Sequence, residues 1–448
     1  MSNSSDFELL VLGGGMGGMT AAAEAALRGA RVIVCEVAGE LGGTALLSTG
    51  NVWTVQTADA FRQADPDGDV ELWQVVRDNL EDSLTWVEGM GVPVRERHKA
   101  SSSSTYQPPP IGRNIDIETF MTRSSRAVGR SGGVVLNGTT VSKIHASANG
   151  VTGARITTVA TGDEHDIDVP AVVLATGGFQ GSRELRARHL GEDVADAVAV
   201  RSNPYSAGRG LTLALQVGAA TSPRMDSFYG VILPAVPGEI TEGDYRGLVL
   251  HPAVYGVVLG PDGTRLTDES AGAVGLANAV AHVGRALFVV GPAMIQAAEE
   301  KLGIDLHGLI KAAGGRGARI AAADSLHEVA TTASQWRYDG GRALDTLTTY
   351  DMAMKSGQEL SPSRRTHHLA LGEEGLLVVE VQAAMTSTYG GVRTNTHGQA
   401  LTSDGTPLAG LFAVGVDQGG YNVSGYVGGL SRCLVYGRRA GARALEAT

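Results

Sequence analysis

Two glycine-rich stretches carry the residue types with which this sequence can do chemistry. Residues 420–433 read GYNVSGYVGGLSRC, where Tyr426 offers a phenol hydroxyl among small neighbours, and residues 13–18 read GGGMGG. Because glycine has no side chain, backbone N–H groups in such stretches can approach a flat or negatively charged group closely. We therefore expect both stretches to contact a bound molecule.

The N-terminal stretch fits the pattern G-x-G-x-x-G at Gly13, Gly15 and Gly18, and Glu36 follows roughly twenty residues later. The segments around it have the patterns of a strand, a helix of small residues and a second strand: residues 7–12, 19–28 and 31–35. In this order the glycines admit a pyrophosphate to the helix N-terminus, and the carboxylate accepts hydrogen bonds from a ribose. The arrangement predicts a dinucleotide-binding site.

A second glycine cluster, GELGGTALLSTGNVW, follows at residues 39–53, and a domain that binds only a nicotinamide dinucleotide has no need of it. Further motifs occur in order: AVVLATGGF (171–179), SNPYSAGRGLTLALQVGA (202–219), GPDGTRLTDES (260–270), and TYGGVRTNTHGQAL with PLAGLFAVGVDQGG (388–420). In these motifs the chain resembles the flavoprotein family of fumarate reductase, succinate dehydrogenase flavoprotein subunits, 3-ketosteroid dehydrogenases and tricarballylate dehydrogenase. The resemblance covers nearly the whole chain and is nearest to the last two branches.

The resemblance implies an α/β fold, with a Rossmann-like FAD-binding domain (a parallel sheet with an inserted β-meander) and an α+β cap domain. The FAD-binding domain is expected at residues 1–225 and 356–448, and the cap at 226–355. Two domains also suit 448 residues, a length beyond the usual growth of one hydrophobic core. Alternating apolar residues and turn signals predict the meander between residues 133 and 173, and helical spacing predicts a helix over 70–89.

The resemblance implies that the cofactor is FAD. The segment GGTALLSTG lacks the histidine to which succinate dehydrogenase-type chains attach FAD, so non-covalent FAD is expected. In this family Asp417 falls where an acid holds the ribityl chain, and the N–H groups near Leu430 and Ser431 fall at a helix N-terminus that faces flavin N1 and O2. The full set of expected cofactor contacts is Gly13, Gly15, Met16, Gly17, Gly18, Glu36, Val37, Gly42, Gly43, Thr44, Ser48, Thr49, Gly50, Val141, Ala175, Thr176, Gly177, Gly208, Gly210, Asp417, Gly429, Leu430 and Ser431.

Family members move a hydride between a substrate carbon and flavin N5, while a second group moves a proton on the adjacent carbon. Fumarate reductases hold a dicarboxylate with a histidine and an arginine, whose positions here are Thr386 and Tyr426. Without these cations a fixed dicarboxylate loses its bidentate partner. The proton-transfer position, four residues after Glu269, is Ala273, which can do no acid–base work. We therefore expect Tyr229 or Tyr255 of the cap as its replacement.

Tyr426 occupies the place of a tyrosine that, in ketosteroid dehydrogenases, holds the substrate ketone together with a backbone N–H, here that of Leu430. A phenol and a backbone donor form an oxyanion hole for an enolate. The leading expectation is an FAD-dependent α,β-dehydrogenase or ene-reductase of a carbonyl-bearing, largely apolar, ketosteroid-like or cyclic ketone. Further expected substrate contacts are Trp53, Tyr106 and Tyr389.

Two alternatives stay open. Tricarballylate dehydrogenases also carry a tyrosine in a similar N-Y-P-G-G context, so a polycarboxylate substrate is one of them. The other is an FAD-binding protein with a degenerate site that acts as a sensor or accessory subunit, because Ala273 stands at the proton-transfer position.

The composition narrows the range of partners. A net charge of −11 without a basic stripe argues against nucleic acid and anionic membranes. The two cysteines have no metal-ligand spacing, so no metal site is expected and a reducing compartment is favoured. The N-terminus has no basic leader, and no apolar run of about 18 residues follows, so we expect a cytoplasmic protein without membrane insertion. The expected partners are a small-molecule substrate and a separate electron acceptor or donor.

Overall fold

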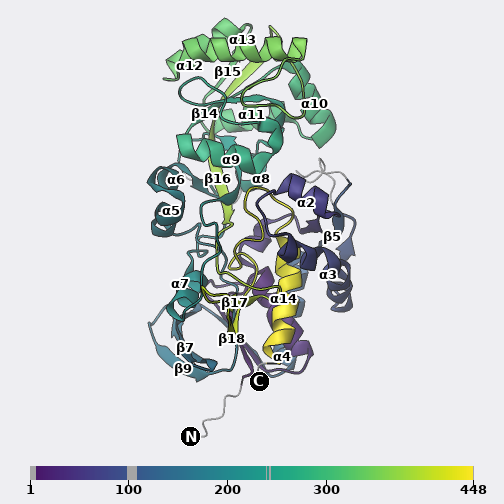
Figure 1. The fold of residues 1–448 in the computed structure, drawn as a ribbon, viewed down its shortest axis with the longest axis vertical. Coiled ribbons are helices and arrows are strands. Elements are labelled where there is room, and N and C mark those ends of the chain that lie inside the picture. Colours follow the sequence, from purple (N-terminus) through teal and green to yellow (C-terminus); the bar gives the residue numbers. More distant parts are fainter. Residues whose placement is uncertain (1–6, 98–107, 239, 242–243, 447–448) are drawn as a thin grey trace.

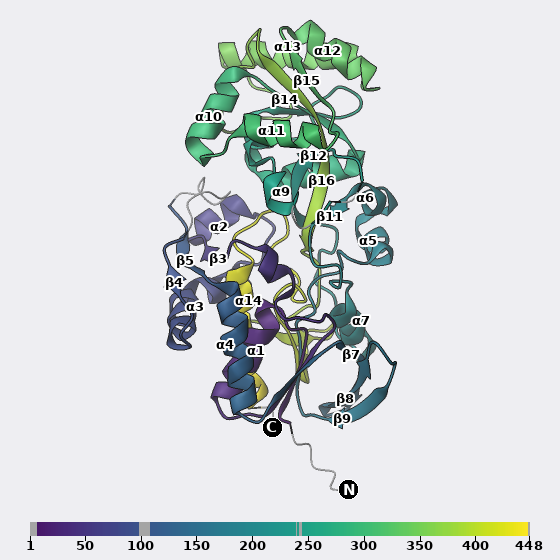
Figure 2. The same cartoon turned by 180° about the vertical axis from the view of Figure 1, so that it is seen from behind.

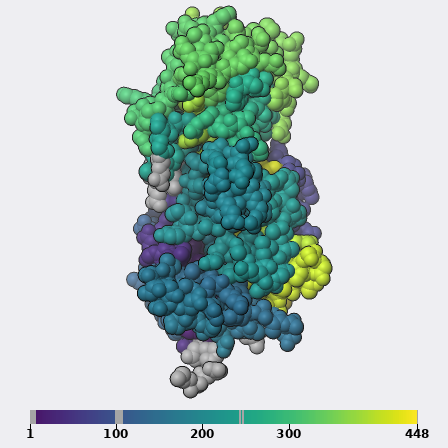
Figure 3. Space-filling view, turned by 90° about the vertical axis from the view of Figure 1, so that its left-hand side faces the viewer, coloured from purple at the N-terminus to yellow at the C-terminus, as the bar shows by residue number. Residues whose placement is uncertain are grey.

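The computed structural model describes residues 7–97, 108–238, 240–241 and 244–446. The molecule is elongated, with the purple N-terminal segments in one half and residues 326–356 at the far end of the other (Figure 1). The space-filling view shows the same division, with green residues at one end and blue residues at the opposite end (Figure 3). No helix in the described ranges combines the length and the apolar character that a membrane crossing requires.

The first half is built on a six-stranded sheet in the order β17-β18-β10-β1-β2-β6. Its strands are β1 (Leu9–Leu12), β2 (Val32–Glu36), β6 (Val134–Asn137), β10 (Val172–Leu174), β17 (Gln399–Leu401) and β18 (Pro407–Ala413). All neighbouring pairs are parallel except β17–β18. The central strands are apolar and buried throughout, as expected for a parallel sheet covered on both faces. The predicted strands at 7–12 and 31–35 are therefore confirmed.

Helices cover this sheet. Helix α1 (Met16–Leu27) packs along α14 (Leu430–Ala444) and α4 (Ile117–Arg130). Close approach of α1 and α14 is possible because small residues face each other: a Cβ on Gly441 would lie 2.4 Å from the backbone oxygen of Ala21. Helix α1 begins three residues earlier than the predicted segment 19–28, because Gly15 is its N-cap. The remaining helices of this half are α2 (Ala58–Ala64), α3 (Val70–Gly89) and α7 (Arg209–Gln216), and α3 confirms the helix predicted over 70–89.

Two smaller sheets flank the parallel one. The antiparallel sheet β7-β8-β9 is the predicted meander, with strands β7 (Thr139–Ser147), β8 (Gly150–Thr158) and β9 (Glu164–Asp168). It is shorter than predicted, because β6 and β10 at the ends of the segment join the parallel sheet. The other small sheet has the order β3-β5-β4, with β3 (Asn51–Thr54), β4 (Val94–Arg95) and β5 (Ile111–Ile115).

The second half is built around the long strand β16 (Leu376–Thr388), which runs from the far end back toward the parallel sheet (Figure 2). It pairs with β11 (Ala199–Val200), β12 (Phe228–Pro234), β14 (Ala286–Val290) and β15 (Ile320–Ala323), and β13 (Val257–Leu259) pairs with β14. The helices of this half are α5 (Arg183–Leu190), α6 (Glu192–Ala197), α8 (Asp244–Gly247), α9 (Ala273–Val283), α10 (Pro292–Leu302), α11 (Leu306–Gly315), α12 (Leu326–Gln335) and α13 (Gly340–Ser356). Both β11 and β16 lie outside the range 226–355 that the sequence assigned to a cap.

Candidate functional site

A cavity of about 810 Å³ extends from the first glycine turn, at the C-terminal ends of β1 and β10, to the ends of β12 and β16. The position of the turn follows from the register, since Leu12 of β1 pairs with Leu174 of β10. Gly13 lies at φ +103°, and a Cβ there would lie 2.3 Å from the carbonyl oxygen of Ala175. Only glycine fits this turn, which brings the two strand ends together at one edge of the cavity.

The N-terminus of α1 faces the cavity through Gly15, Met16 and Gly17. Its N-cap is Gly15, where a Cβ would meet nothing nearer than 3.8 Å, so no side chain of this residue covers the first turn of the helix. Glu36 lines the same region and accepts hydrogen bonds from the N–H groups of Gly14 (2.6 Å) and Ala38 (2.8 Å). A positive helix end that can donate to phosphates, beside a carboxylate that can accept from a ribose, is the arrangement of a dinucleotide site.

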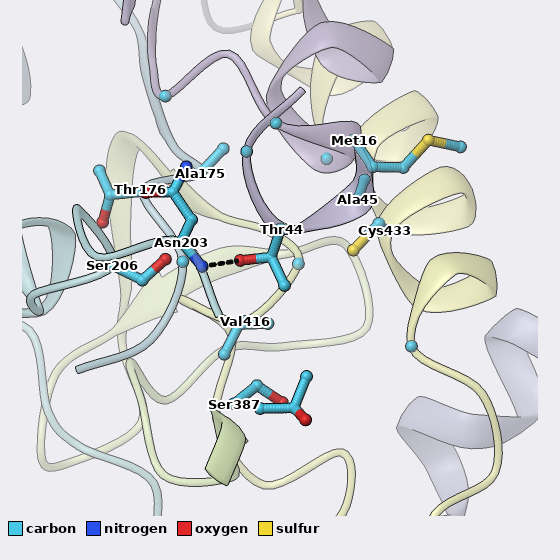
Figure 4. Close-up of a pocket in the computed structure, with 18 of the residues that line it drawn as sticks. Met16, Thr44, Ala45, Ala175, Thr176, Asn203, Ser206, Ser387, Val416 and Cys433 are labelled. Atoms are coloured by element: carbon cyan, nitrogen blue, oxygen red, sulfur yellow. Dashed lines mark hydrogen bonds between the residues drawn. The ribbon is translucent and has the colours of Figure 1, made fainter. Parts of the chain in front are cut away.

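The second glycine cluster forms a 3₁₀ turn, Gly43–Leu47, that lines the cavity. Thr44 Oγ1 accepts a hydrogen bond of 3.2 Å from the backbone N–H of Asn203. In Figure 4 these two residues meet across the cavity, with Thr176 and Ser206 on one side and Met16 and Cys433 on the other. The segments around Thr44 and Asn203, which are far apart in sequence, are therefore in contact at the dinucleotide end of the cavity.

The N-terminus of α14 reaches the cavity at Gly429 and Leu430. Ser431 fixes it there, because its hydroxyl donates 2.7 Å to the backbone oxygen of Trp53. Gly428, at φ +102°, allows the contact, since a Cβ there would lie 1.8 Å from the same oxygen. The predicted helix N-terminus near Leu430 and Ser431 is thus present, and it is tied to the strand that carries Trp53.

Most residues that the sequence assigned to the cofactor line the cavity: Gly13, Gly15, Met16, Gly17, Glu36, Val37, Gly42, Gly43, Thr44, Ser48, Thr49, Ala175, Thr176, Gly177, Gly429 and Leu430. The following assigned residues are not part of the lining: Gly18, Gly50, Val141, Gly208, Gly210, Asp417 and Ser431. Asp417 is fully buried and accepts hydrogen bonds from the backbone N–H and hydroxyl of Thr176, so it holds the turn that lines the cavity. Burial raises the pKa of Asp417 to about 7, against the opposing hydrogen bonds from Thr176.

At the other end of the cavity, aromatic rings form one wall. The rings of Tyr229 and Tyr426 stack with centroids 4.0 Å apart and planes 9° apart, and the Trp53 ring meets Tyr426 edge-on at 5.7 Å. The hydroxyl of Tyr426 accepts a hydrogen bond of 3.0 Å from the N–H of Gly429. Burial raises the pKa of Tyr426, so the phenol is neutral at physiological pH. A neutral phenol that already accepts one hydrogen bond is a stronger donor to a substrate oxygen.

The loop that carries Tyr426 is held from two sides. Asp65 is fully buried and accepts hydrogen bonds from the backbone N–H groups of Val423 (3.0 Å) and Ser424 (2.8 Å). Tyr389, an expected substrate contact, lines the cavity, but its hydroxyl donates 2.5 Å to the backbone oxygen of Gly425. Both contacts fix the orientation of the phenol of Tyr426.

A cationic corner, which the sequence did not predict, lies beside the aromatic wall. Arg201 lines the cavity directly after β11 and donates 2.9 Å to Thr386 Oγ1. Its charge also reaches His251, whose pKa is lowered to about 4 mainly by burial and further by Arg201. Thr386 and Tyr426 stand where fumarate reductases carry a histidine and an arginine, and Arg201, from a different segment, brings a cation to this end of the cavity.

A β-bulge presents this corner to the cavity. Tyr229 of β12 pairs with Ser387 of β16, but the next residue, Gly230, pairs with Met385, which leaves Thr386 as the extra residue. Neighbouring strand residues normally point to opposite faces, yet Thr386 and Ser387 both line the cavity. The sequence held only weak signals for these two residues. Arg201 directly precedes the 202–219 motif, and His251 is followed by a proline.

Several predicted residues lie away from the cavity. Tyr255 does not line it; the ring is buried and packs on His367 with centroids 4.1 Å apart. Ala273 begins α9 and is not part of the lining either. Glu269 is fully buried and pairs with Arg265 (2.6 Å) and Arg364 (3.2 Å), so its carboxylate belongs to an internal ion-pair cluster. Tyr106, another expected substrate contact, lies outside the described residues.

Comparison with known proteins identifies the occupant of the cavity. The pattern of the family described as FAD binding domain matches residues 8–431. The chain is 24% identical to the fumarate reductase (cytochrome) of Shewanella frigidimarina over 98% of this chain and 77% of that protein. It is 22% identical to the 4-oxocyclohexanecarboxylate 2-dehydrogenase of Sinomonas cyclohexanicum over 95% and 90%.

The fold is also similar to that of flavoproteins of known structure. The 3-ketosteroid Δ1-dehydrogenase of Sterolibacterium denitrificans superposes with a TM-score of 0.77 at 15% identity, over 99% of this chain and all of that one. The cavity also fits FAD, since its volume lies in the range of cofactor sites, and two helix N-termini and a carboxylate line its length. The chain therefore belongs to the FAD-binding domain family, and it is an FAD-dependent oxidoreductase that acts on CH–CH groups.

Proposed function

We propose that this chain catalyses the α,β-dehydrogenation, or the reverse reduction, of a carbonyl-bearing, largely apolar small molecule such as a cyclic ketone. The observation that carries the proposal is the hydroxyl of Tyr426, a neutral donor held by the N–H of Gly429 in an aromatic wall of the cavity. A hydrogen bond from this phenol to a carbonyl oxygen favours the enolate that forms when the α-carbon loses a proton.

Dehydrogenation removes a proton from the α-carbon and a hydride from the β-carbon, which leaves one carbon–carbon double bond. FAD, when bound, supplies the two-electron acceptor for the hydride, or the donor in the reverse direction. The residues of the chain must orient the carbonyl, exclude water and move the proton. Trp53, Tyr229 and Val231 line the wall against which an apolar body packs, and burial of that body excludes water.

Tyr229 is the proposed proton-transfer group. Its ring lies in the cavity against Tyr426, whereas Tyr255 and Ala273 lie outside the lining. Burial raises the pKa of Tyr229, and the charge of Arg201 opposes that rise. The phenol is therefore protonated and can donate its proton in the reduction, which leaves a phenolate. The charge of Arg201 stabilises this phenolate, and the phenolate takes up the α-proton in the reverse dehydrogenation.

The test uses the holoenzyme under anaerobic conditions. Mixing with 4-oxocyclohexanecarboxylate, cyclohexanone or a 3-ketosteroid should bleach the absorbance of oxidised flavin, whereas tricarballylate and succinate should leave it unchanged. The first ketone is chosen because a relative of 22% identity carries its name. Bleaching by a polycarboxylate alone would overturn the proposal.

A second candidate function is the dehydrogenation or reduction of a polycarboxylate. The observation that favours it is the Arg201 guanidinium beside Thr386, and a fumarate reductase is among the relatives. The same experiment separates the two, because polycarboxylates then bleach the flavin and ketones do not. A chain that responds to neither class in either direction, yet binds FAD, would instead be a sensor or accessory subunit.

The electron partner is proposed to be a separate molecule, since the cavity assigned here accounts for one dinucleotide and one small substrate. A cytoplasmic location is proposed on the strength of Cys35 and Cys433, both of which are free thiols. To test for a separate acceptor, the rate at which soluble dyes reoxidise the substrate-reduced enzyme is compared with the rate at which oxygen reoxidises it.

A further inference from the structure

Two of the polar groups at the substrate end of the cavity differ chemically. One is the hydroxyl of Tyr426, which is neutral because burial raises its pKa. The other is the guanidinium of Arg201, which holds its charge under all conditions in proteins. Among the described residues that line the cavity, Glu36 is the only carboxylate, and it lies at the dinucleotide end.

Arg201 and Tyr229 are held on either side of β16, and Tyr426 approaches from the loop before α14. Val200 pairs with Met385 in parallel, and the N–H of Arg201 donates 2.7 Å to the Met385 carbonyl. The Arg201 side chain therefore lies beside Thr386, to which it donates a hydrogen bond. Tyr229 stands opposite Ser387 on the other side of β16. The Tyr229 ring stacks on Tyr426, and the charge of Arg201 reaches its hydroxyl and lowers its pKa against the effect of burial.

Apolar and aromatic side chains line the same cavity as these two contacts. Tyr229 and Val231 are two residues apart on β12 and line the cavity from the same strand face, and Leu47 and Trp53 line it as well. A ligand that satisfies the whole surface has a hydrogen-bond acceptor at one end, an anion at the other and an apolar body between them.

The other arginine near Tyr426 does not duplicate the anion contact. Arg432 is buried in the first turn of α14, with its guanidinium 5.2 Å over the Tyr421 ring and 3.5 Å from the carbonyl oxygen of Gln418. Arg432 also lines the cavity, but this hydrogen bond and the ring contact direct its guanidinium toward the chain itself. A dicarboxylate therefore has a cationic partner at Arg201 and a neutral one at Tyr426, so the two ends of the site favour different groups.

We infer that the substrate is an oxo acid, with its carbonyl oxygen at the Tyr426 hydroxyl and a single carboxylate at the Arg201 guanidinium. This inference rests on the proposed function, because it adds the acid group to a substrate whose carbonyl Tyr426 already holds. A planar guanidinium suits a carboxylate through two parallel hydrogen bonds, which a lysine in its place cannot form. Arg201 is thus a specificity-determining residue that selects acids over neutral ketones.

The experiment compares 4-oxocyclohexanecarboxylate with its methyl ester, which keeps the ketone and loses the charge. Binding to the FAD-loaded protein is measured by calorimetry, and turnover with an artificial electron-accepting dye. The wild type should bind the acid about ten- to a hundredfold more tightly than the ester, the range expected for a charged hydrogen bond. Arg201→Gln should remove this preference, and Arg201→Lys should keep part of it.

The control variant is Arg183→Gln, which removes an exposed arginine paired with Asp196 and should keep the full preference. Equal binding of acid and ester to the wild type, no binding of either, or an unchanged preference in Arg201→Gln would overturn the inference. The failure of the proposed function looks different: the acid binds in an Arg201-dependent way, but the dye is not reduced and the flavin is not bleached.

Discussion

The Tyr229 ring lies parallel to the Tyr426 ring, with centroids 4.0 Å apart and planes within 9°. One phenol comes from β12 and the other from the loop before α14, so the stack joins the two halves of the molecule at the substrate end of the cavity. Similar rings in one stack have different roles in the proposed reaction, and single substitutions can separate them.

Removing either hydroxyl should reduce turnover in its own way. Tyr426→Phe should lower kcat about 10²- to 10³-fold and also weaken ketone binding, because an oxyanion donor is lost. Tyr229→Phe should lower kcat about 10²- to 10⁴-fold with little change in KM, because the proton-transfer group is lost but the binding surface remains. Steady-state kinetics at saturating FAD measures both.

Tyr436→Phe provides the matched control for these variants. Tyr436 is buried, and its hydroxyl donates 3.1 Å to the carbonyl of Leu72, away from the cavity lining. The Tyr436→Phe variant should be about 1 kcal/mol less stable than the wild type and should keep the wild-type kcat. If Tyr229→Phe resembles this control, Tyr229 is a packing residue and the proton must be moved by another group.

Gly428→Ala should disrupt the junction between α14 and β3. Alanine at φ +102° costs roughly 1–2 kcal/mol, and its Cβ would lie 1.8 Å from the Trp53 carbonyl. We expect a lower melting temperature and a reduced ratio of FAD to protein. Gly405→Ala is the control, since Gly405 has φ +87° and no neighbouring atom within 4 Å. Equal losses in the two variants would show that backbone strain alone matters.

FAD should be bound without a covalent link. The turn Gly43–Leu47 carries no nucleophilic histidine, and although the Cys433 thiol lines the cavity, burial raises its pKa and keeps it protonated. Acid precipitation should therefore leave all of the flavin absorbance in the supernatant, with Cys433→Ser behaving identically. Yellow colour that stays with the washed precipitate would contradict this.

Local patterns in the sequence were enough to predict the dinucleotide end. The strand, glycine turn and helix around Gly13 depend on neighbours in sequence, and the periodicity over 70–89 depends on one helix face. The cationic corner depends instead on a contact between residues 185 positions apart, Arg201 and Thr386, and on a shift in strand register that no local pattern encodes. For the same reason the sequence could not choose between Tyr229 and Tyr255, because only the tertiary fold directs one ring into the cavity and the other onto His367.

The buried carboxyl of Asp417 should make stability fall as pH rises. Burial raises its pKa from 3.8 to about 7, so between these values the folded state binds a proton that the unfolded state has released. The free energy of unfolding then decreases with rising pH across this window. The melting temperature of the holoenzyme should fall from pH 5 to pH 8, and Asp417→Asn should flatten the profile. Asp404→Asn, at an exposed carboxyl whose pKa is lowered, should keep the wild-type slope.

Glu269 should prove to be structural. Its carboxylate accepts hydrogen bonds from Arg265 (2.6 Å), Arg364 (3.2 Å) and the N–H of Val258 (3.0 Å), and its side chain has no exposed surface. Glu269→Gln leaves two buried guanidinium groups without a countercharge, which costs about 3–5 kcal/mol when one partner of a buried pair is removed.

The kinetics distinguish this role from catalysis. Since Glu269 is not part of the cavity lining, the folded, FAD-loaded fraction of Glu269→Gln should keep the wild-type kcat and its pH profile. Asp196→Asn, which breaks the exposed pair with Arg183, should change stability by less than about 1 kcal/mol. A variant at Glu269 that melts normally but loses kcat would instead assign this carboxylate to the proton path, and Tyr229 would no longer be needed for that step.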